Sequence, residues 1–307
     1  MCRGRREAVS KHAAGRYIGC MTKDSKTGTP KDSHYARLRR SHRRSEDGDR
    51  PAAKPRPRPG QPAPALPADG LVRLYGLHTV RAALDNPARK VRRMLVTRNA
   101  AARLGLAEPL SLPFPAEIVE PRDIDRILGS EAVHQGAMIE AEPLTPKRLA
   151  ALSDTPLVLV LDQVTDPHNV GAILRSGVAF GAGALITTAR HSPAETGVLA
   201  KAASGALEHI DLIEVRNLAE AIGELHAAGF ETIGLDSEGP DELEKTFSGR
   251  KIALVLGAEG KGLRQKTRAT VTALARLDMP GAIRSLNVSN AAAVALYAAR
   301  RHLGSDG

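Results

Sequence analysis

The sequence predicts an α/β protein whose main sheet is parallel. Two runs, PLVLVLD at 156–162 and KIALVLG at 251–257, are apolar almost throughout, as expected of strands buried on both faces. Between and after them, short apolar runs alternate with segments of helical spacing. This alternation is typical of a parallel sheet with helices on both faces, in which ligands bind beyond the carboxyl ends of the strands.

A small α/β domain is predicted first, over residues 72–143. Apolar residues recur at helical spacing after Tyr75 and Gly76, and VRRMLVTR indicates a strand. AEIVE indicates a second strand, PRDIDRILG a short helix, and HQGAMIEAEPL a strand that closes the domain. The segment TPKRLAALSDT then leads into the larger part of the chain.

The larger domain is predicted over residues 155–304. Its expected helices begin at Asn169 and lie around 197–207, 217–229, 263–270 and 287–302. Its expected strands are PLVLVLD, GALITT, DLIEV, FETIGLD, KIALVLG and ALARLDM. Loops that follow Asp162, Leu256 and Met279 would therefore lie at the carboxyl edge of the sheet, where a ligand site is expected.

Residues 1–69 are predicted to form a disordered basic arm. Residues 1–60 contain 17 Lys and Arg against 6 Asp and Glu, whereas 61–307 contain 27 basic and 28 acidic residues. Seven of the seventeen residues from Pro51 to Pro67 are proline, which favours extended conformers and prevents core packing. The arm is either a solvated tail or an attractor of phosphate backbones.

Composition argues against several classes of protein. Aromatic residues make up 3% of the chain and Trp is absent, which disfavours a nucleic-acid reader built on base stacking. The two cysteines, Cys2 and Cys20, support neither a disulfide framework nor a cysteine metal site, and they fit a reducing compartment. Apolar runs fall short of the roughly 20 residues of a membrane span. We therefore expect a cytoplasmic protein that neither associates with a membrane nor binds a metal.

The first strand-end loop, LDQVTDPHNVGAILRSG, contains a turn signal at 166–169, with Asn169 as a candidate N-cap. Arg175 follows within the helix and is the only charged residue from Asn169 to Thr188 in the sequence. An isolated arginine in an apolar helix requires a carboxylate, a phosphate or the edge of a cleft.

The other two loops are rich in glycine and in small polar residues. LVLGAEGKGLRQKTR places Gly257, Gly260 and Gly262 around Glu259, where glycine permits close backbone approach, although the phosphate-loop spacing GxxxxGK[ST] is absent. MPGAIRSLNVSN precedes an alanine-rich helix, and one of its side chains is expected to cap that helix. One cap uses one polar side chain, so capping alone does not account for Ser285, Asn287 and Ser289 together.

The three loops together resemble motifs 1, 2 and 3 of the SpoU (TrmH-like) RNA ribose 2′-O-methyltransferases of the SPOUT class. The matching segments are HNVGAILRS, LVLGAEGKGL and MPGAIRSLNVSNAAAVALY, in the family's order and spacing. LYGLHTVRAAL and AVHQG upstream are similar to the ribosomal-protein-like substrate domain of the RlmB-type subgroup. The resemblance implies a deep trefoil knot in the larger domain and a homodimer. It also implies S-adenosyl-L-methionine as methyl donor and the ribose of a 23S rRNA guanosine as acceptor.

The resemblance also implies roles for particular residues. The implied cofactor-binding residues are Gly257, Leu277, Met279 and Leu286. The implied catalytic residues are Arg175, Asn169, Glu259, Ser285 and Asn287. Arginine normally stays charged, so Arg175 would stabilise the developing alkoxide rather than act as a base, with Asn169 and Glu259 fixing its position.

Several alternatives stay open at this point. The same chemistry could act on tRNA, or the chain could be a non-catalytic RNA-binding assembly factor; DNA is not an expected partner.

Two single residues also stay open. Asn290 stands where many members of the resembled family carry a small apolar residue. His134 is either a structural residue of a turn or a contact to RNA.

Overall fold

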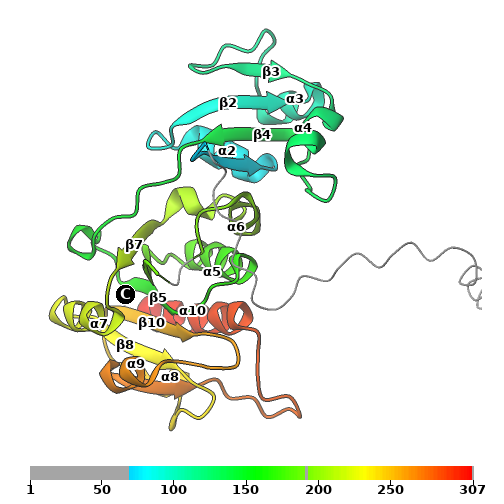
Figure 1. The fold of residues 1–307 in the computed structure, drawn as a ribbon. Coiled ribbons are helices and arrows are strands. Elements are labelled where there is room, and N and C mark those ends of the chain that lie inside the picture. Colours follow the sequence, from blue (N-terminus) through cyan, green and yellow to red (C-terminus); the bar gives the residue numbers. More distant parts are fainter. Residues whose placement is uncertain (1–68, 191–192, 306–307) are drawn as a thin grey trace, which may run out of the picture. The chain divides into compact units, whose positions relative to one another are not determined.

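The computed structural model describes residues 69–190 and 193–305, which form two sheets and their helices (Figure 1). The predicted arm at 1–69 lies outside the described residues except for Asp69, and so do both cysteines. Within the described ranges, no helix is long and apolar enough to cross a membrane.

The small sheet has four strands in the order β1-β4-β2-β3. Its strands are β1 (Val72–Tyr75), β2 (Val91–Val96), β3 (Ala116–Ile118) and β4 (Ala137–Ala141), and its helices are α2 (Leu77–Asp85), α3 (Arg98–Leu104) and α4 (Pro121–Leu128). Strand β4 runs antiparallel to β1 and β2, whereas β2 and β3 are parallel. The sequence-based prediction lacked β1 and α3. Strand β1 has only four residues, and α3 is an alanine-rich segment without a clear apolar period.

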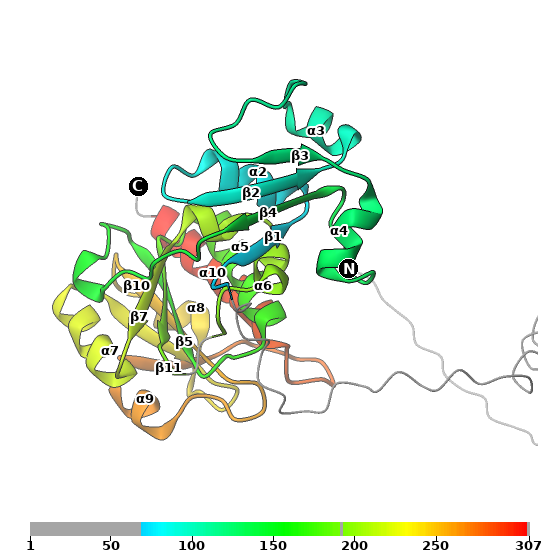
Figure 2. The same ribbon diagram turned by 45° about the horizontal axis from the view of Figure 1, so that its top comes forward.

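The large sheet has seven strands in the order β7-β6-β5-β10-β8-β11-β9, and every neighbouring pair is parallel. Figure 2 labels four of them: β5, β7, β10 and β11. Its strands are β5 (Leu157–Asp162), β6 (Ala184–Thr188), β7 (Asp211–Val215), β8 (Glu231–Leu235), β9 (Asp241–Glu242), β10 (Ile252–Gly257) and β11 (Ala273–Arg276). The predicted parallel sheet is confirmed. The two apolar runs of the sequence form adjacent central strands, β5 and β10, in register from Leu157 with Ile252 to Asp162 with Gly257.

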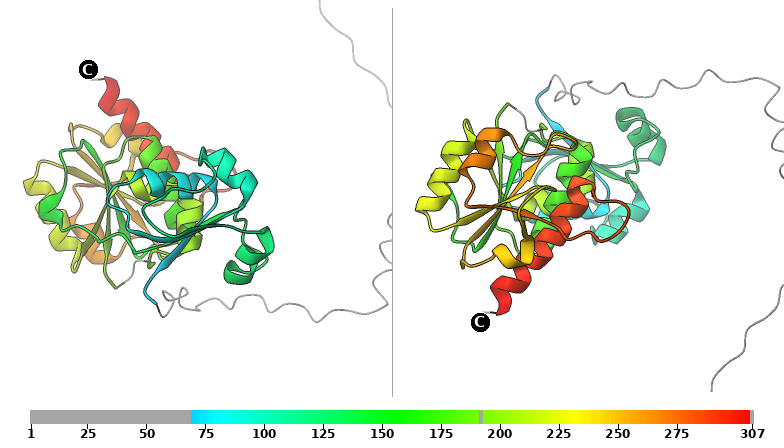
Figure 3. Two further views of the ribbon diagram at one scale, coloured as in Figure 1. Left: turned by 90° about the horizontal axis from the view of Figure 1, so that it is seen from above. Right: turned by 90° about the horizontal axis from the view of Figure 1, so that it is seen from below.

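Helices cover both faces of the large sheet (Figure 3). They are α5 (Pro167–Ala179), α6 (Gly197–Ala203), α7 (Leu218–Ala227), α8 (Leu243–Thr246), α9 (Gln265–Thr270) and α10 (Val288–Ser305), with short 3-10 turns η1 (Leu149–Ala151) and η2 (Ala206–His209). Alternate residues of β5 enter different cores: Leu159 packs with α5, α6 and α10, whereas Val160 packs with α7. This alternation is the reason that the strand is apolar at every position.

Helix α5 begins two residues earlier than predicted. Asp166, not Asn169, is the N-cap, and its carboxylate accepts a hydrogen bond from the His168 N–H at 3.0 Å. Pro167 occupies the first turn, where its fixed φ suits a helix and its missing N–H leaves no bond unmade. Asn169 therefore lies inside the helix, and its side chain is available for a tertiary contact.

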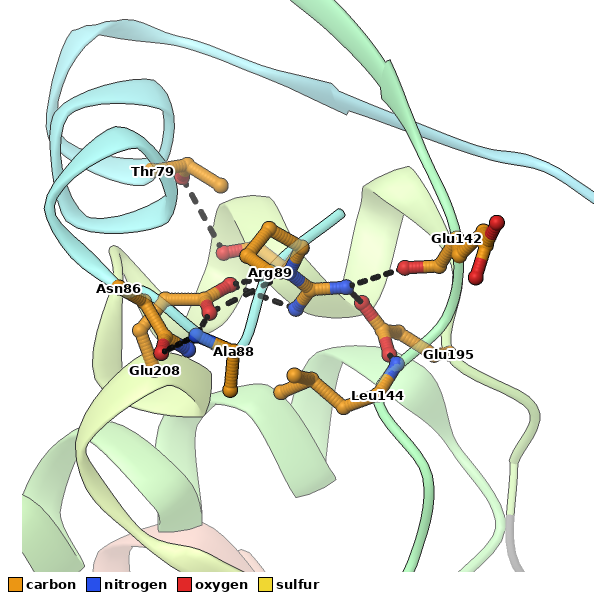
Figure 4. A network of polar contacts seen from close by, with 9 residues as sticks. Thr79, Asn86, Ala88, Arg89, Glu142, Leu144, Glu195 and Glu208 are labelled. Carbon is orange, nitrogen blue, oxygen red and sulfur yellow. Dashed lines mark hydrogen bonds and ion pairs between the residues drawn. The ribbon is translucent and has the colours of Figure 1, made fainter. Parts of the chain in front are cut away.

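A buried ionic network joins the small sheet to the large one (Figure 4). Arg89, which follows α2, has a fully buried side chain and forms ion pairs with Glu195 at 2.7 Å and Glu208 at 2.6 Å. Arg89 also donates to the Glu142 carbonyl at 3.0 Å, and the Leu144 N–H donates to Glu195 at 2.8 Å. The two predicted domains accordingly lie within one compact unit and share an apolar core.

Candidate active site

Loops at the carboxyl edge of the large sheet surround one cavity of about 280 Å³. The four residues predicted to bind the cofactor all line it: Gly257, Leu277, Met279 and Leu286. Glu259 and Ser285 from the predicted catalytic set line the same cavity. The position agrees with the rule that parallel sheets bind ligands beyond the carboxyl ends of their strands.

Gly257 allows the loop after β10 to fold back on itself. A Cβ atom at this position would lie 2.2 Å from the Gly262 carbonyl carbon and 2.4 Å from the Leu263 nitrogen, so no other residue fits. Gly262 has φ of 63°, and its N–H donates to the Ala258 carbonyl at 2.8 Å to close the turn. The cavity wall here is therefore made of backbone, which leaves amides and carbonyls close to any bound ligand.

A buried carboxylate anchors the far end of the same loop. Asp162, at the end of β5, is fully buried and accepts hydrogen bonds from the Arg264 N–H at 3.0 Å and from its Nε at 2.6 Å. The two contacts fix the chain where α9 begins. This role of Asp162 was not predicted; the available signal in the sequence was a lone charge closing an apolar run.

Three of the predicted catalytic side chains form one polar network. Asn169 donates to Glu259 at 3.1 Å, and Asn287 donates to Glu259 at 2.6 Å and to the Asn169 side-chain oxygen at 3.0 Å. The Val288 N–H lies 3.4 Å from the same Glu259 oxygen, so the carboxylate sits at the N-terminus of α10, where negative charge is favourable. The network connects the first turn of α5 with the loops that carry Glu259 and Asn287.

The capping prediction for the third loop is confirmed in a specific form. The Asn287 side-chain oxygen accepts from the Ser289 N–H at 2.9 Å and from the Ser289 hydroxyl at 2.6 Å, while its amide group faces Glu259. Asn287 thus caps α10 and joins the polar network with opposite ends of one amide. Ser285 lies on the exposed part of the loop, and Asn290 is exposed in the first turn of α10.

Arg175 is not brought to this network within the chain. It lies on an exposed face of α5, where it lines a separate surface groove together with residues of α2 and η2. Glu259 and Asn169 instead line a second depression, of about 470 Å³, with Asp166 and Lys261. The expectation that Asn169 and Glu259 fix Arg175 is therefore wrong for a single chain, because six residues of helix carry Arg175 to another face.

His134 uses both ring nitrogens within the small domain, one in its own turn and one on α4. Its Nδ1 accepts from the Gly136 N–H at 3.0 Å, which leaves Nε2 to donate to Asp125 at 3.1 Å. The side chain is buried. This arrangement favours the structural interpretation of the AVHQG segment over a contact to RNA.

Comparisons with known proteins match both parts of the chain. The family described as "SpoU rRNA Methylase family" matches residues 156–297, and the one described as "RNA 2'-O ribose methyltransferase substrate binding" matches 73–147. The 23S rRNA (guanosine-2'-O-)-methyltransferase RlmB of Pseudomonas putida is 37% identical over 75% of this chain and 96% of its own length. Its namesake from Ralstonia nicotianae is 38% identical over 74% and 94%.

Solved structures share the fold at lower identity. The SpoU methyltransferase AviRb from Streptomyces viridochromogenes, in complex with the cofactor AdoMet, aligns with a TM-score of 0.64 at 22% identity, over 77% of this chain and 92% of its own. An AdoMet-bound rRNA methyltransferase from Sinorhizobium meliloti aligns with a TM-score of 0.65 at 24% identity, over 76% and 88%.

Proposed function

The chain belongs to the SpoU rRNA methylase family, and from this we propose that it transfers a methyl group from S-adenosylmethionine to the ribose 2′-hydroxyl of a guanosine in 23S rRNA. The observation that carries the proposal is the Asn169–Glu259–Asn287 network beside the strand-end cavity. The substrate follows the RlmB relatives, which this chain matches over almost their whole length.

The cavity suits S-adenosylmethionine as a ligand. Leu277 and Leu286 give it apolar walls for an adenosine, and the loop after Gly257 gives it backbone groups. The charged side chains of the lining are Asp236, which is paired with Arg268, Glu259 and Arg284, so the cavity is not the cationic site that a polyphosphate requires. When bound, the cofactor supplies a methyl group on a positively charged sulfur, which is already a strong electrophile.

The residues of the chain then have to orient the ribose and help its hydroxyl lose a proton. Glu259 holds Asn169 and Asn287 in place through two amide donors, so we assign it an organising role. We assign the shaping of the ribose site to Ser285, which lines the cavity, and to Asn287, which belongs to the network beside it. Arg175 stabilises the developing alkoxide as a fixed positive charge.

We further propose a homodimer in which Arg175 acts at the partner's cavity. Of six large apolar side chains exposed within the described residues, four lie in one stretch: Ile283, Leu286, Val294 and Tyr297. Val294 and Tyr297 are three residues apart and share a face of α10, while Leu286 also lines the cavity. A partner that covers this apolar face would lie against the cavity and could bring its own Arg175 there. The proposal also includes the trefoil knot and a cytoplasmic location.

Substitution of Arg175 tests the catalytic assignment. We expect Arg175→Ala to reduce methyl transfer to 23S rRNA by about 10²–10³-fold, the loss typical of removing one charge-stabilising group. Binding of S-adenosylmethionine, measured by calorimetry, should stay within about twofold, since Arg175 is assigned to the ribose hydroxyl and not to the cofactor. Arg216→Ala, which removes an exposed arginine next to β7, is the matched control. Full activity of Arg175→Ala would refute the assignment.

Mapping ribose methylation with and without the protein tests the substrate. We expect one 23S rRNA guanosine to lose its 2′-O-methyl group when the protein is removed. A methylation lost from tRNA instead would refute the rRNA assignment, and no lost methylation together with no cofactor binding would indicate an assembly factor.

A further inference from the structure

A surface groove lies where the small sheet meets the large one, away from the cofactor cavity. It has a volume of about 340 Å³ and is lined from three elements: α2, α5 and the turn from α6 to η2. His78, Arg81 and Asp85 of α2 are spaced by three and four residues, so they share one helix face. Arg175 comes from α5 and His209 from η2. All five side chains are exposed.

The walls of this groove are cationic although the body of the protein is not. Two arginines and two histidines face one carboxylate, so the groove is positive even with both imidazoles neutral. Residues 61–307 carry 27 basic and 28 acidic residues, so this local surplus does not follow from overall composition. The lining contains no Phe, Tyr or Trp, and its polar side chains are mainly cationic, so charge is the main means of recognition that it offers.

The shape of the groove is held by close packing beneath it. Its floor is made of small residues, including Ala82, Ala203 and Gly205. A Cβ on Gly205 would lie 2.8 Å from the Ala82 Cβ and its φ is 95°, so only glycine allows η2 to approach α2 this closely. Arg81 is itself tied down, because its Nη2 donates to the Leu104 carbonyl. A guanidinium has further donors that remain for a ligand.

We infer that this groove binds a backbone phosphate of the RNA substrate, which His78 and Arg81 of α2 and His209 of η2 contact beside Arg175 of α5. The inference rests on the proposed function for the identity of the ligand. Guanidinium groups match phosphate oxygens in a fork geometry, and phosphate contacts fix the register of a nucleic acid without reading its sequence. A strand held here passes beside Arg175, the side chain assigned to the ribose. The groove would thus set which part of the RNA reaches the reacting centre.

The test is binding of a fluorescein-labelled RNA hairpin of arbitrary sequence, measured by anisotropy from 50 to 200 mM KCl. We expect Arg81→Gln to weaken binding about three- to tenfold and to make the slope of log K against log salt shallower by about 0.7 to 0.9. His209→Gln should weaken binding in the same sense. Asp85→Asn removes the carboxylate of the groove and should tighten binding by about threefold. A variant that failed to fold would lose the groove, so unfolding would not explain tighter binding by Asp85→Asn.

The matched control is Lys245→Gln, which removes one positive charge from α8, next to the opposite end of the large sheet, and should leave binding within twofold. Heat unfolding of each variant separates loss of the site from loss of the fold. If Arg81→Gln and Asp85→Asn both bind as the wild type does, the groove is not a phosphate site.

The groove and the proposed function can fail separately. Methyl transfer by the wild type tests the function alone. If transfer is seen and the groove variants leave both KM for RNA and hairpin binding unchanged, only the groove is refuted. If transfer is absent but Arg81→Gln and Asp85→Asn shift binding in opposite directions, the groove stands as an RNA-phosphate site and the proposed function is refuted.

Discussion

Buried carboxylates in this protein are each placed against a cation. Asp162 faces Arg264, and Glu195 and Glu208 face Arg89. Removing a charge from water is unfavourable unless a partner and hydrogen bonds replace the lost hydration. The two carboxylates at Arg89 share one guanidinium, so one positive charge faces two negative charges. Burial raises the pKa of Glu195, although the charge of Arg89 acts to lower it.

The raised pKa of Glu195 predicts a pH dependence of stability. The folded protein holds a proton on Glu195 more tightly than the unfolded chain does, so the contribution of Glu195 to the free energy of unfolding should fall as pH rises above the ordinary pKa of 4.5. Glu195→Gln removes this titration. The stability of the variant relative to the wild type should therefore increase from pH 4.5 to pH 8, as measured by urea unfolding.

Glu142 offers a control of opposite sign. A hydrogen bond from Arg92 lowers the pKa of this carboxyl, so its contribution to stability is present above its ordinary pKa and is lost as pH falls. The difference between wild type and Glu142→Gln should accordingly shrink toward low pH. If the Glu195→Gln curve stays parallel to the wild-type curve at every pH, the network does not titrate as described.

At the scale of elements, the loop between β10 and α9 is held at both ends. Gly257 permits the backbone to fold back at one end, and Asp162 binds Arg264 at the other. The loop between them forms one wall of the cavity that we propose for the cofactor. Loss of either anchor would alter the cavity without touching a catalytic side chain.

Gly257→Ala tests this dependence. The added Cβ would lie 2.2 Å from Gly262, so the loop has to shift. We expect the free energy of unfolding to fall by about 1–3 kcal/mol, as for other overpacked sites. Calorimetry should show S-adenosylmethionine binding weakened by at least about tenfold, or 1.4 kcal/mol.

Gly223→Ala is the matched control for this substitution. Gly223 lies inside α7 with no atom within 4 Å of an added Cβ. Alanine there should stabilise the protein by about 0.5–1 kcal/mol through helix propensity. Normal cofactor binding by Gly257→Ala would show that the fold of this loop does not shape the cavity.

At the scale of the whole molecule, the exposed apolar face of α10 is expected to pair two copies of the chain. Tyr297 is 56% exposed and packs edge-on against Phe180 of the same chain, with ring centres 6.0 Å apart. A large aromatic ring on an exposed face contributes strongly to an interface.

Tyr297→Glu should place a charge in the centre of this interface. We expect sedimentation to show a monomer for the variant and a dimer for the wild type. Methyl transfer by the variant should be lower, because Arg175 of a monomer has no partner cavity to reach. Tyr75→Phe, at the half-buried end of β1, serves as the aromatic control. A wild-type monomer with full activity would contradict the proposal.

The parallel sheet and the position of the three loops at its carboxyl edge follow from the amino-acid sequence alone. Continuous apolar runs require burial on both faces, and the carboxyl ends of parallel strands meet at one edge. The loops that carry Gly257, Leu277 and Leu286 could therefore be placed together from the order of the strands. Local signals were less reliable: Asp166 caps α5 where Asn169 was expected, and β1 and α3 are too short or too rich in alanine to show a period.

Which polar groups meet is settled by tertiary packing and not by sequence pattern. Asp162 finds Arg264 across 102 residues of chain, and Arg89 finds Glu208 across 119. Packing also separates Arg175 from Glu259 and places it in a groove with Arg81. Periodicity reports which face of an element is buried but not which element packs against it, and the strength of an ion pair depends on that packing. The partners of charged groups are therefore a property of the fold.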